Sequence, residues 1–345
     1  MTQLPDLKDL TCPEMEAFIA DLGKERYRAK QIMKWIYRFG LTSFEDMTDL
    51  SRDFRDSMSS RARISSLALE KIIESRDGTK KALWRLDDGL AIESVLIREK
   101  NHWTLCISTQ AGCAMGCAFC YTGTMGLKRN LRTSEIVDQV TRLRFTFPEG
   151  KDIKNIVMMG MGEPLANYEN TVKAIGIITD DWGLAVSKRR VTVSTCGLVP
   201  LIYRLGRDTS ANLAVSLNAA DDVTRQALMP VNSTYPLNKL LEACRAYNMP
   251  RRRRITFEYI VIAGVNDGDD DAEKLARLLR TVRCKINLIP FNEFPGSPLK
   301  TPSEERVQAF RNILIERGYT TMVRMSKGSD ILAACGQLTG ESSPE

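Results

Sequence analysis

From residue 103 onward, short apolar segments alternate with helical segments, and this alternation restricts the fold more than any other feature of the sequence. Six such units occur, with strands expected at residues 103–108, 155–160, 190–195, 213–217, 255–262 and 285–291. Because strands joined by helical crossovers pair in parallel, we expect an α/β fold. A complete barrel of this type has eight units. Six units therefore predict an incomplete (β/α)6 TIM-like barrel.

The segments on either side of this barrel divide the chain further. Residues 13–62 contain three stretches with apolar residues at helical spacing. Residues 80–97 have the pattern of two strands joined by an Asp-Gly turn, which is typical of a hairpin. We predict four parts: a helical accessory domain at 1–75, a β-hairpin linker at 76–100, the partial barrel at 101–325 and a C-terminal tail at 326–345.

The composition is that of a globular protein, with 43% hydrophobic and 27% charged residues. The first thirty residues or so alternate acids and bases, without the apolar run of a signal peptide or membrane span. Nine cysteines form no small-domain disulfide pattern, which favours thiols kept in a reducing compartment. We therefore expect a cytoplasmic, monomeric protein without membrane contact.

The charges favour a polyanionic partner. Lys and Arg number 49 against 43 Asp and Glu. The basic residues gather in three clusters: Lys128, Arg129 and Arg132; Lys188 to Arg190; and Arg251 to Arg254. Any one run is also typical of a solvated face, but three together permit an RNA or phosphate partner. With one histidine, His102, in the chain, histidine relays and His-rich metal sites are almost excluded.

Unusual residues follow the ends of five predicted strands, where barrels of this type build active sites. Ordinary turn chemistry explains any one of them but not all five together. They are the cysteine segment 113–120, the Gly-rich segment 160–164, Ser194 with Thr195, the segment 216–218, and the segment 290–292.

Three cysteines, Cys113, Cys117 and Cys120, follow the first predicted strand in a CxxxCxxC pattern. Structural zinc sites and protein-held iron-sulfur clusters usually take four protein ligands. Three thiols leave one iron open to a small molecule. The pattern resembles the radical S-adenosylmethionine (SAM) superfamily, in which the cofactor's amino and carboxylate groups fill that position. The resemblance implies a [4Fe-4S] cluster on these cysteines.

The resemblance also implies which residues bind SAM. The segment from Gly160 to Glu163 resembles the glycine-rich SAM segment, where small residues allow close approach of the backbone and a carboxylate can accept from the cofactor's ammonium. The implied SAM-binding residues are Gly162, Glu163, Ser194, Ser216, Leu217, Asn218 and Asn292.

Within the superfamily, the chain is similar to the RlmN/Cfr family of RNA adenine methyltransferases, closest to its RlmN branch. The supporting segments span nearly the whole chain: YRAKQIMKWIYRFGLTSFEDMTDLS, AIESVLI, LCISTQAGCAMGCAFCYTG, RNLRTSEIVDQV, GMGEPLANYENT, VTVSTCG, LAVSLNAADD, MPVN, FEYIVIAGVND and SDILAACGQL. The resemblance implies that Cys335 carries the methyl group as S-methylcysteine. It implies further that Cys106 is the resolving thiol, in a transient disulfide with Cys335, and that Glu93 is the proton acceptor. A core role for Cys106, a cap of a terminal turn for Cys335 and an exposed strand carboxylate for Glu93 are the alternatives.

The same resemblance implies the reaction and its partners. Two SAM molecules are used per turnover, one to methylate Cys335 and one to generate the radical that activates the methyl group. The target is carbon 2 of an adenosine in the peptidyl-transferase region of 23S rRNA and of the adenosine 3' of the anticodon in tRNA. An extruded base fits such chemistry, and flavodoxin or ferredoxin would supply electrons. The expected RNA surface comprises Arg26, Arg28, Lys30, Lys34, Arg38 and the Arg251 to Arg254 run.

Two other functions stay open. One is the Cfr-like reaction at carbon 8 of adenine, which uses the same cysteines. The other is a non-catalytic zinc or iron-sulfur module with Cys106 as a fourth ligand. The chain also departs from the expected family pattern at Tyr121, Cys196 and Asn218, where we would expect small residues at the first two positions and histidine at the third.

Overall fold

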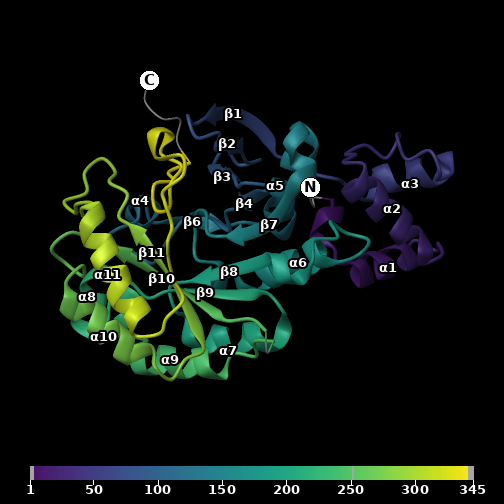
Figure 1. The fold of residues 1–345 in the computed structure, drawn as a ribbon. Helices are drawn as coiled ribbons and strands as arrows, with labels where there is room; N and C mark the ends of the chain where they lie inside the picture. The colour runs from purple at the N-terminus through teal and green to yellow at the C-terminus, as the bar shows by residue number, and fades with distance from the viewer. Residues whose placement is uncertain (1–3, 251, 341–345) are drawn as a thin grey trace.

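One ten-stranded sheet organises the computed structural model, which describes residues 4–250 and 252–340 (Figure 1). Its strand order is β1-β2-β3-β4-β7-β8-β9-β10-β11-β12. The pairs from β1 to β4 are antiparallel, and those from β4 to β12 are parallel. The sheet thus changes from an antiparallel extension to a barrel at β4.

The parallel part confirms the predicted incomplete barrel with helical crossovers. Its strands are β4 (Trp103–Cys106), β7 (Ile153–Met158), β8 (Val191–Thr195), β9 (Asn212–Ser216), β10 (Ile255–Val261), β11 (Cys284–Pro290) and β12 (Thr321–Val323). Its helices are α5 (Thr133–Thr146), α6 (Tyr168–Thr179), α7 (Val199–Asp208), α8 (Asp222–Leu228), α9 (Leu237–Ala246), α10 (Asp269–Leu279) and α11 (Glu304–Glu316). The central strands are buried on both faces, as parallel strands covered by helices must be.

The antiparallel extension consists of β1 (Ala68–Glu74), β2 (Lys80–Arg85) and β3 (Ala91–Arg98). Strands β2 and β3 are the predicted hairpin, but β3 also pairs with β4 from Val95↔Cys106 to Arg98↔Trp103. The hairpin is therefore part of the barrel sheet and not a separate connection. Strand β1 lies within the range predicted to be helical, and all of its residues are exposed or half-buried.

The helices α1 (Cys12–Asp21), α2 (Tyr27–Arg38) and α3 (Arg52–Arg61) form a module at one side of the barrel, near α5 and α6 (Figure 1). Lys8, in the short 3-10 helix Leu7–Asp9, joins this module to α5. Its Nζ lies 2.5 Å from Asp138 Oδ1 and donates to the Ser65 carbonyl at 2.7 Å. Both side chains of the ion pair are 1% exposed.

Replacing Lys8 with methionine is expected to lower the free energy of unfolding by about 3–5 kcal/mol, because it leaves the Asp138 carboxylate buried without its cation. Urea denaturation of the purified protein measures this loss. The matched control is Lys30→Met, which removes an ion pair to Glu16 at a half-exposed position and is expected to change stability by about 0.5 kcal/mol or less. Equal effects of the two changes would contradict the prediction.

The cysteine segment is enclosed by a separate two-stranded arm. Strands β5 (Gln110–Gly112) and β6 (Leu127–Asn130) pair antiparallel, and the short helix α4 (Tyr121–Thr124) lies between them. Gly112 has φ of 75°, and a Cβ there would lie 2.0 Å from the Gly126 carbonyl oxygen. Glycine is therefore required where the two ends of the arm meet.

In the described ranges, no helix combines the length and the apolar character needed to cross a membrane.

Candidate active site

All three cysteines of the CxxxCxxC pattern line one cavity of about 150 Å³ at the carboxyl ends of the parallel strands. The cavity brings together residues from the ends of β7, β8, β9 and β10 and from the C-terminal tail. The sequence-predicted residues that line it are Cys113, Cys117, Cys120, Gly162, Glu163, Ser194, Ser216, Asn218 and Cys335. Residues that lie far apart in the sequence thus meet at one point.

The donor set of this cavity fits an iron-sulfur cluster. Among the residues that the structure describes, no three Cys, His, Asp or Glu side chains are close enough together to hold a single metal ion. Iron-sulfur clusters are held in proteins by cysteine thiolates. Thiolates suit such iron centres, and burial raises the pKa of Cys113 to about 11. We infer that these cysteines bind metal only as thiolates, with release of their protons.

The loop after β7 packs tightly against the chain that leads to the cysteines. A Cβ on Gly160 would lie 2.8 Å from the Ile107 carbonyl, and one on Gly162, where φ is 99°, would lie 2.5 Å from Gln110 Cβ. Any side chain at either position would push the two loops apart. The glycines thus bring this backbone to the edge of the cavity.

Glu163 lies at the cavity wall and is almost completely buried. Its Oε1 accepts from the Leu165 amide at 3.0 Å, and its Oε2 accepts from the Cys196 amide at 2.8 Å. Burial raises the pKa of this carboxyl. Glu163 therefore joins the loops after β7 and β8 at the wall of the cavity.

The two positions after Ser216 that the sequence predicts to bind SAM are buried in the protein. Leu217 is completely buried and does not line the cavity. Asn218 has a left-handed φ of 60°, which asparagine tolerates better than most residues. Its Oδ1 accepts from the Ile260 amide at 2.9 Å, and its Nδ2 donates to Met229 Sδ at 3.3 Å. The asparagine that departs from the expected pattern thus connects the ends of β9 and β10.

The other two departures also have structural reasons. The Tyr121 ring stacks on Phe294, with centroids 5.1 Å apart and planes inclined by 11°. Cys196 is buried, and its amide and carbonyl are held by Glu163 and by Arg225. Both residues therefore contribute packing around the cavity.

Asn292 contacts the tail and does not line the cavity of the three cysteines. Its Nδ2 donates to the Cys335 carbonyl at 3.1 Å, and its Oδ1 accepts from Ser326 Oγ at 2.5 Å. On the other side of the tail, the Tyr121 amide donates to the Gly336 carbonyl at 2.7 Å. Cys335 is thus held between the cysteine segment and the loop after β11.

Cys106 and Cys335 line a second, smaller cavity of about 70 Å³, which also contains Cys120. Cys335 lines both cavities, so it has access to the three cysteines on one side and to Cys106 on the other. All nine cysteines are free. The expected disulfide between Cys106 and Cys335 is therefore not supported, because both residues remain thiols in this conformation.

Burial in the sheet raises the pKa of Cys106 to about 12, with Arg324 opposing the shift. The thiol is therefore protonated at neutral pH, and its reactive thiolate increases with rising pH. We expect alkylation of Cys106 by iodoacetamide to rise by about tenfold per pH unit between pH 7.5 and 9.5, without a plateau. Peptide mass spectrometry measures this rate. The urea-unfolded chain is the control and should level off near pH 9; a plateau below that value in the folded protein would contradict the prediction.

Glu93 lies in β3 and lines neither of these cavities. Its side chain is 1% exposed, so the alternative of an exposed strand carboxylate is wrong. Its Oε1 lies 2.9 Å from Lys81 Nζ, and its Oε2 accepts from the Thr339 and Gly340 amides at 2.8 and 3.1 Å. In this conformation, Glu93 contacts the tail that carries Cys335.

Sequence reasoning missed three charged residues around the site. Arg225 of α8 is completely buried, and its guanidinium donates to the Leu217 and Cys196 carbonyls at 3.1 and 2.7 Å. Glu258 of β10 and Arg324 line the cavity of the three cysteines. Burial raises the pKa of Glu258, and its Oε2 has no hydrogen-bond partner among the described residues. Single charges in helices and strands give no spacing signal, so only their burial identifies them.

The basic clusters differ in their relation to the site. Residues 188–190 precede β8 and residues 252–254 precede β10, at the amino ends of the parallel strands. The cysteines lie beyond the carboxyl ends, so these two runs are at the opposite end of the barrel from the cavity. Arg129, in the arm near the cavity, pairs with Asp88 and Glu135. An adenine base held in the cavity of the three cysteines would therefore be contacted by residues outside these basic clusters.

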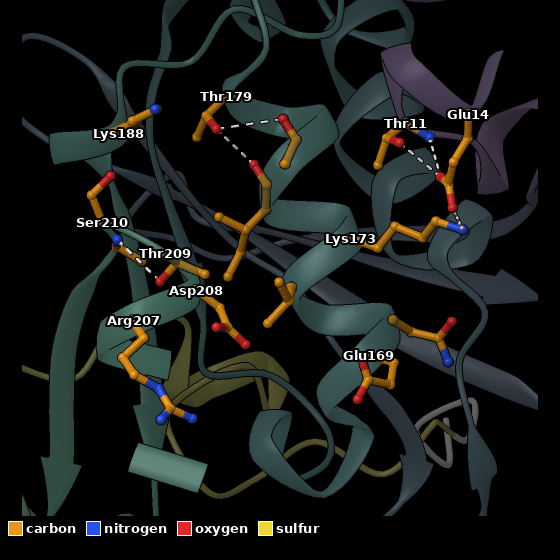
Figure 2. Close-up of a pocket in the computed structure, with 15 residues that line it drawn as sticks. Thr11, Glu14, Glu169, Lys173, Thr179, Lys188, Arg207, Asp208, Thr209 and Ser210 are labelled. Carbon is orange, nitrogen blue, oxygen red and sulfur yellow. Dashed lines mark hydrogen bonds and ion pairs between the residues drawn. The ribbon is translucent and has the colours of Figure 1, made fainter. Parts of the chain in front are cut away.

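A larger cavity, of about 800 Å³, lies between α1, α6 and the end of α7 (Figure 2). Both acidic and basic side chains line it, and Glu14 pairs with Lys173 at 2.8 Å. None of the sequence-predicted site residues lines it. Size alone therefore does not identify the active site of this chain.

Comparisons with known proteins agree with this geometry. Residues 5–64 match the family described as ribosomal RNA large subunit methyltransferase N-terminal domain, and residues 107–279 match the radical SAM superfamily. The chain is 57% identical to the dual-specificity RNA methyltransferase RlmN of Syntrophus aciditrophicus, covering 99% of this chain and 98% of that protein. It is 52% identical to the protein of the same name from Geobacter sulfurreducens, covering 99% and 94%. A radical SAM methyltransferase from Sphaerobacter thermophilus has a similar crystal structure, with a TM-score of 0.92, 46% identity and coverage of 98% of this chain and all of that one.

Proposed function

The chain belongs to the RlmN family of radical SAM RNA methyltransferases, and on this premise we propose that it methylates carbon 2 of adenosine in 23S rRNA and tRNA. The rRNA target is in the peptidyl-transferase region, and the tRNA target is the adenosine 3' of the anticodon. One observation supports the proposal above all others: Cys335 lines both the cavity of the three motif cysteines and the cavity of Cys106. The proposed methyl carrier thus lies next to the proposed cluster ligands and next to the thiol of Cys106.

Cys113, Cys117 and Cys120 would hold a [4Fe-4S] cluster. When bound, this cluster supplies the electron for reductive cleavage of SAM, which gives a radical able to activate the methyl group on Cys335. Three protein thiols would leave one iron of the cluster for a ligand that the protein does not supply. Gly162, Glu163, Ser194 and Ser216 line the same cavity as these cysteines. These four residues would bind the cofactor. Two SAM molecules are used per turnover, and the electron donor is a flavodoxin or ferredoxin.

Protein thiols are required because of the chemistry of the target. Carbon 2 of adenine is electron-poor and lacks a lone pair, so it attacks a methyl sulfonium poorly. In the proposed reaction, the sulfur of Cys335 takes the methyl group first and delivers it to the ring as a tethered carbon unit. Glu93 accepts the ring proton, and the Cys106 thiolate then attacks the Cys335 sulfur. A transient disulfide forms between the two cysteines while the bond from the Cys335 sulfur to the tethered carbon breaks and releases the RNA, and a reductant must open this disulfide before the next turnover. Since Cys106 is buried, its attack requires a change in its surroundings that favours the thiolate.

The base must leave its stack to reach the cavity. Single-stranded or looped RNA allows this at the lowest cost, and an anticodon loop and the peptidyl-transferase region both offer such nucleotides. We propose that the helical module with Arg26, Arg28 and Lys34 contacts phosphates of the RNA. The protein works as a cytoplasmic monomer in this proposal.

Nucleoside mass spectrometry tests the function. Reconstituted protein is incubated with SAM, a reductant and either tRNA or 23S rRNA, and the RNA is digested to nucleosides. Formation of 2-methyladenosine in both substrates is expected. Formation of 8-methyladenosine alone would replace the proposal by the Cfr-like reaction, and 2-methyladenosine in only one RNA would contradict dual specificity.

A further inference from the structure

A buried ion pair outside the cysteine cavities connects the antiparallel extension to the C-terminal tail. Lys81 in β2 and Glu93 in β3 lie on the same face of the sheet, since Lys81 is opposite Val95 and Glu93 is two residues before Val95 in the same strand. Their charged atoms are 2.9 Å apart, and the side chains are 3% and 1% exposed. Charges so deeply buried require partners on all sides.

Those further partners are backbone groups at both ends of the tail segment 332–340. Lys81 Nζ donates to the Leu332 carbonyl at 3.2 Å. Glu93 Oε2 accepts from the amides of Thr339 and Gly340 at 2.8 and 3.1 Å. Cys335 lies between these two points. One ion pair therefore holds both ends of the tail segment 332–340, which carries the Cys335 thiol.

The tail packs against the pair closely enough to leave little freedom. A Cβ on Gly340 would lie 2.6 Å from the Ala91 carbonyl, so the tail backbone rests directly on β3. Leu332 has a left-handed φ of 53°, a costly conformation for leucine. Such a conformation persists only where surrounding contacts impose it. The Lys81 contact to the Leu332 carbonyl is one of them.

We propose that Lys81 is a positioning residue for the reaction: through its ion pair with Glu93 it holds the tail closed, so that Cys335 stays between the two cavities. The closed tail depends on the charges of both residues, because the same carboxylate binds Lys81 and the amides of Thr339 and Gly340. The importance of Cys335 rests on the proposed function, but the closure itself does not. Pairing of β2 with β3 does not require the ion pair, since the strands form a regular backbone ladder.

The test compares four variants with the wild-type protein. Lys81→Met removes the charge at nearly constant length, and Lys81→Arg keeps the charge. Glu93→Gln keeps the size of the side chain but removes its charge. Lys80→Met is the matched control, because Lys80 is the neighbouring residue in β2 and pairs instead with Glu149 at 2.9 Å and Glu74 at 3.9 Å.

Two readouts do not depend on catalysis. Hydrogen exchange of the peptide covering residues 332–340 reports opening of the tail, and alkylation of Cys335 reports its exposure. We expect Lys81→Met and Glu93→Gln to raise both rates by about tenfold or more, because each leaves a buried partner uncompensated. Lys81→Arg should restore most of the protection, and Lys80→Met should stay within about twofold of wild type. Unchanged exchange in peptides from α5 and β7 verifies that each variant is folded.

Wild-type-like protection of residues 332–340 in Lys81→Met would overturn the inference. So would equal loss of protection in Lys80→Met, since the effect would then belong to β2 as a whole. Mass spectrometry of Cys335 after incubation with SAM separates this inference from the proposed function. A wild-type protein without the added methyl, combined with a loosened tail in Lys81→Met, would support the closure and contradict the carrier role of Cys335.

Discussion

Replacement of Cys335 by alanine is expected to abolish RNA methylation, with a loss of at least about a thousandfold, while cleavage of SAM continues. The reason is that the sulfur of Cys335 carries the methyl group in the proposed reaction, whereas the three motif cysteines that would hold the cluster are left intact. Measuring methylated adenosine and 5'-deoxyadenosine in the same reaction separates the two effects. The expected pattern is cofactor cleavage without RNA product.

Cys244→Ala is the control for this prediction. Cys244 is buried in α9 among hydrophobic residues and lines neither of the cysteine cavities. Its loss should leave methylation within about twofold of wild type, apart from a modest loss of stability. If the Cys335→Ala protein retained a tenth or more of the wild-type methylation, the S-methylcysteine route would be wrong.

Replacement of Cys117 by alanine is expected to remove both activities. Two motif thiols cannot hold a cluster as three do, so iron and sulfide content should fall to a small fraction of the wild-type value. Cleavage of SAM should then fall below detection together with RNA methylation. Iron analysis, visible absorption and 5'-deoxyadenosine formation after anaerobic reconstitution measure these losses.

Cys196→Ala provides a stringent control because Cys196 lines the same cavity as Cys117. Burial raises the pKa of the Cys196 thiol, and its backbone is already held by Glu163 and Arg225. We expect the Cys196→Ala protein to bind iron like wild type. Normal iron content in the Cys117→Ala protein, or equal loss in both, would contradict the assignment of the motif cysteines as cluster ligands.

Much of the fold could be predicted because its signals are local. Strands such as β9 and β10 are short apolar runs followed by helical periodicity, and this pattern is visible without any knowledge of contacts. Strand β1 was not predicted, because its sequence carries no such local signal. Its sequence, ALEKIIE, lies at the edge of the sheet, and every one of its residues is exposed or half-buried. The strand therefore lacks an alternation of buried and exposed positions. Only its pairing with β2 makes it a strand.

The candidate site, too, has a part that local sequence signals predict and a part that they do not. The spacing of Cys113, Cys117 and Cys120 places three thiols on one short loop whatever the rest of the chain does. The sequence predicted Asn292 as a SAM-binding residue and Glu93 as the proton acceptor, but it gave no sign that both side chains contact the tail. Arg225 and Glu258 carried no signal, because a charged residue in a helix or strand is exposed in most proteins. Their burial follows from packing alone.

The sequence by itself determined the order of strands and helices, the cysteine loop and the family, because these depend on residues close together in the chain. Tertiary structure alone decided that Cys106, at the end of β4, and Cys335, in the tail, share one cavity. It also decided that Lys81 and Glu93 hold both ends of the segment that carries Cys335. Contacts between distant segments depend on how the whole core packs, and no local pattern of residue types encodes that packing.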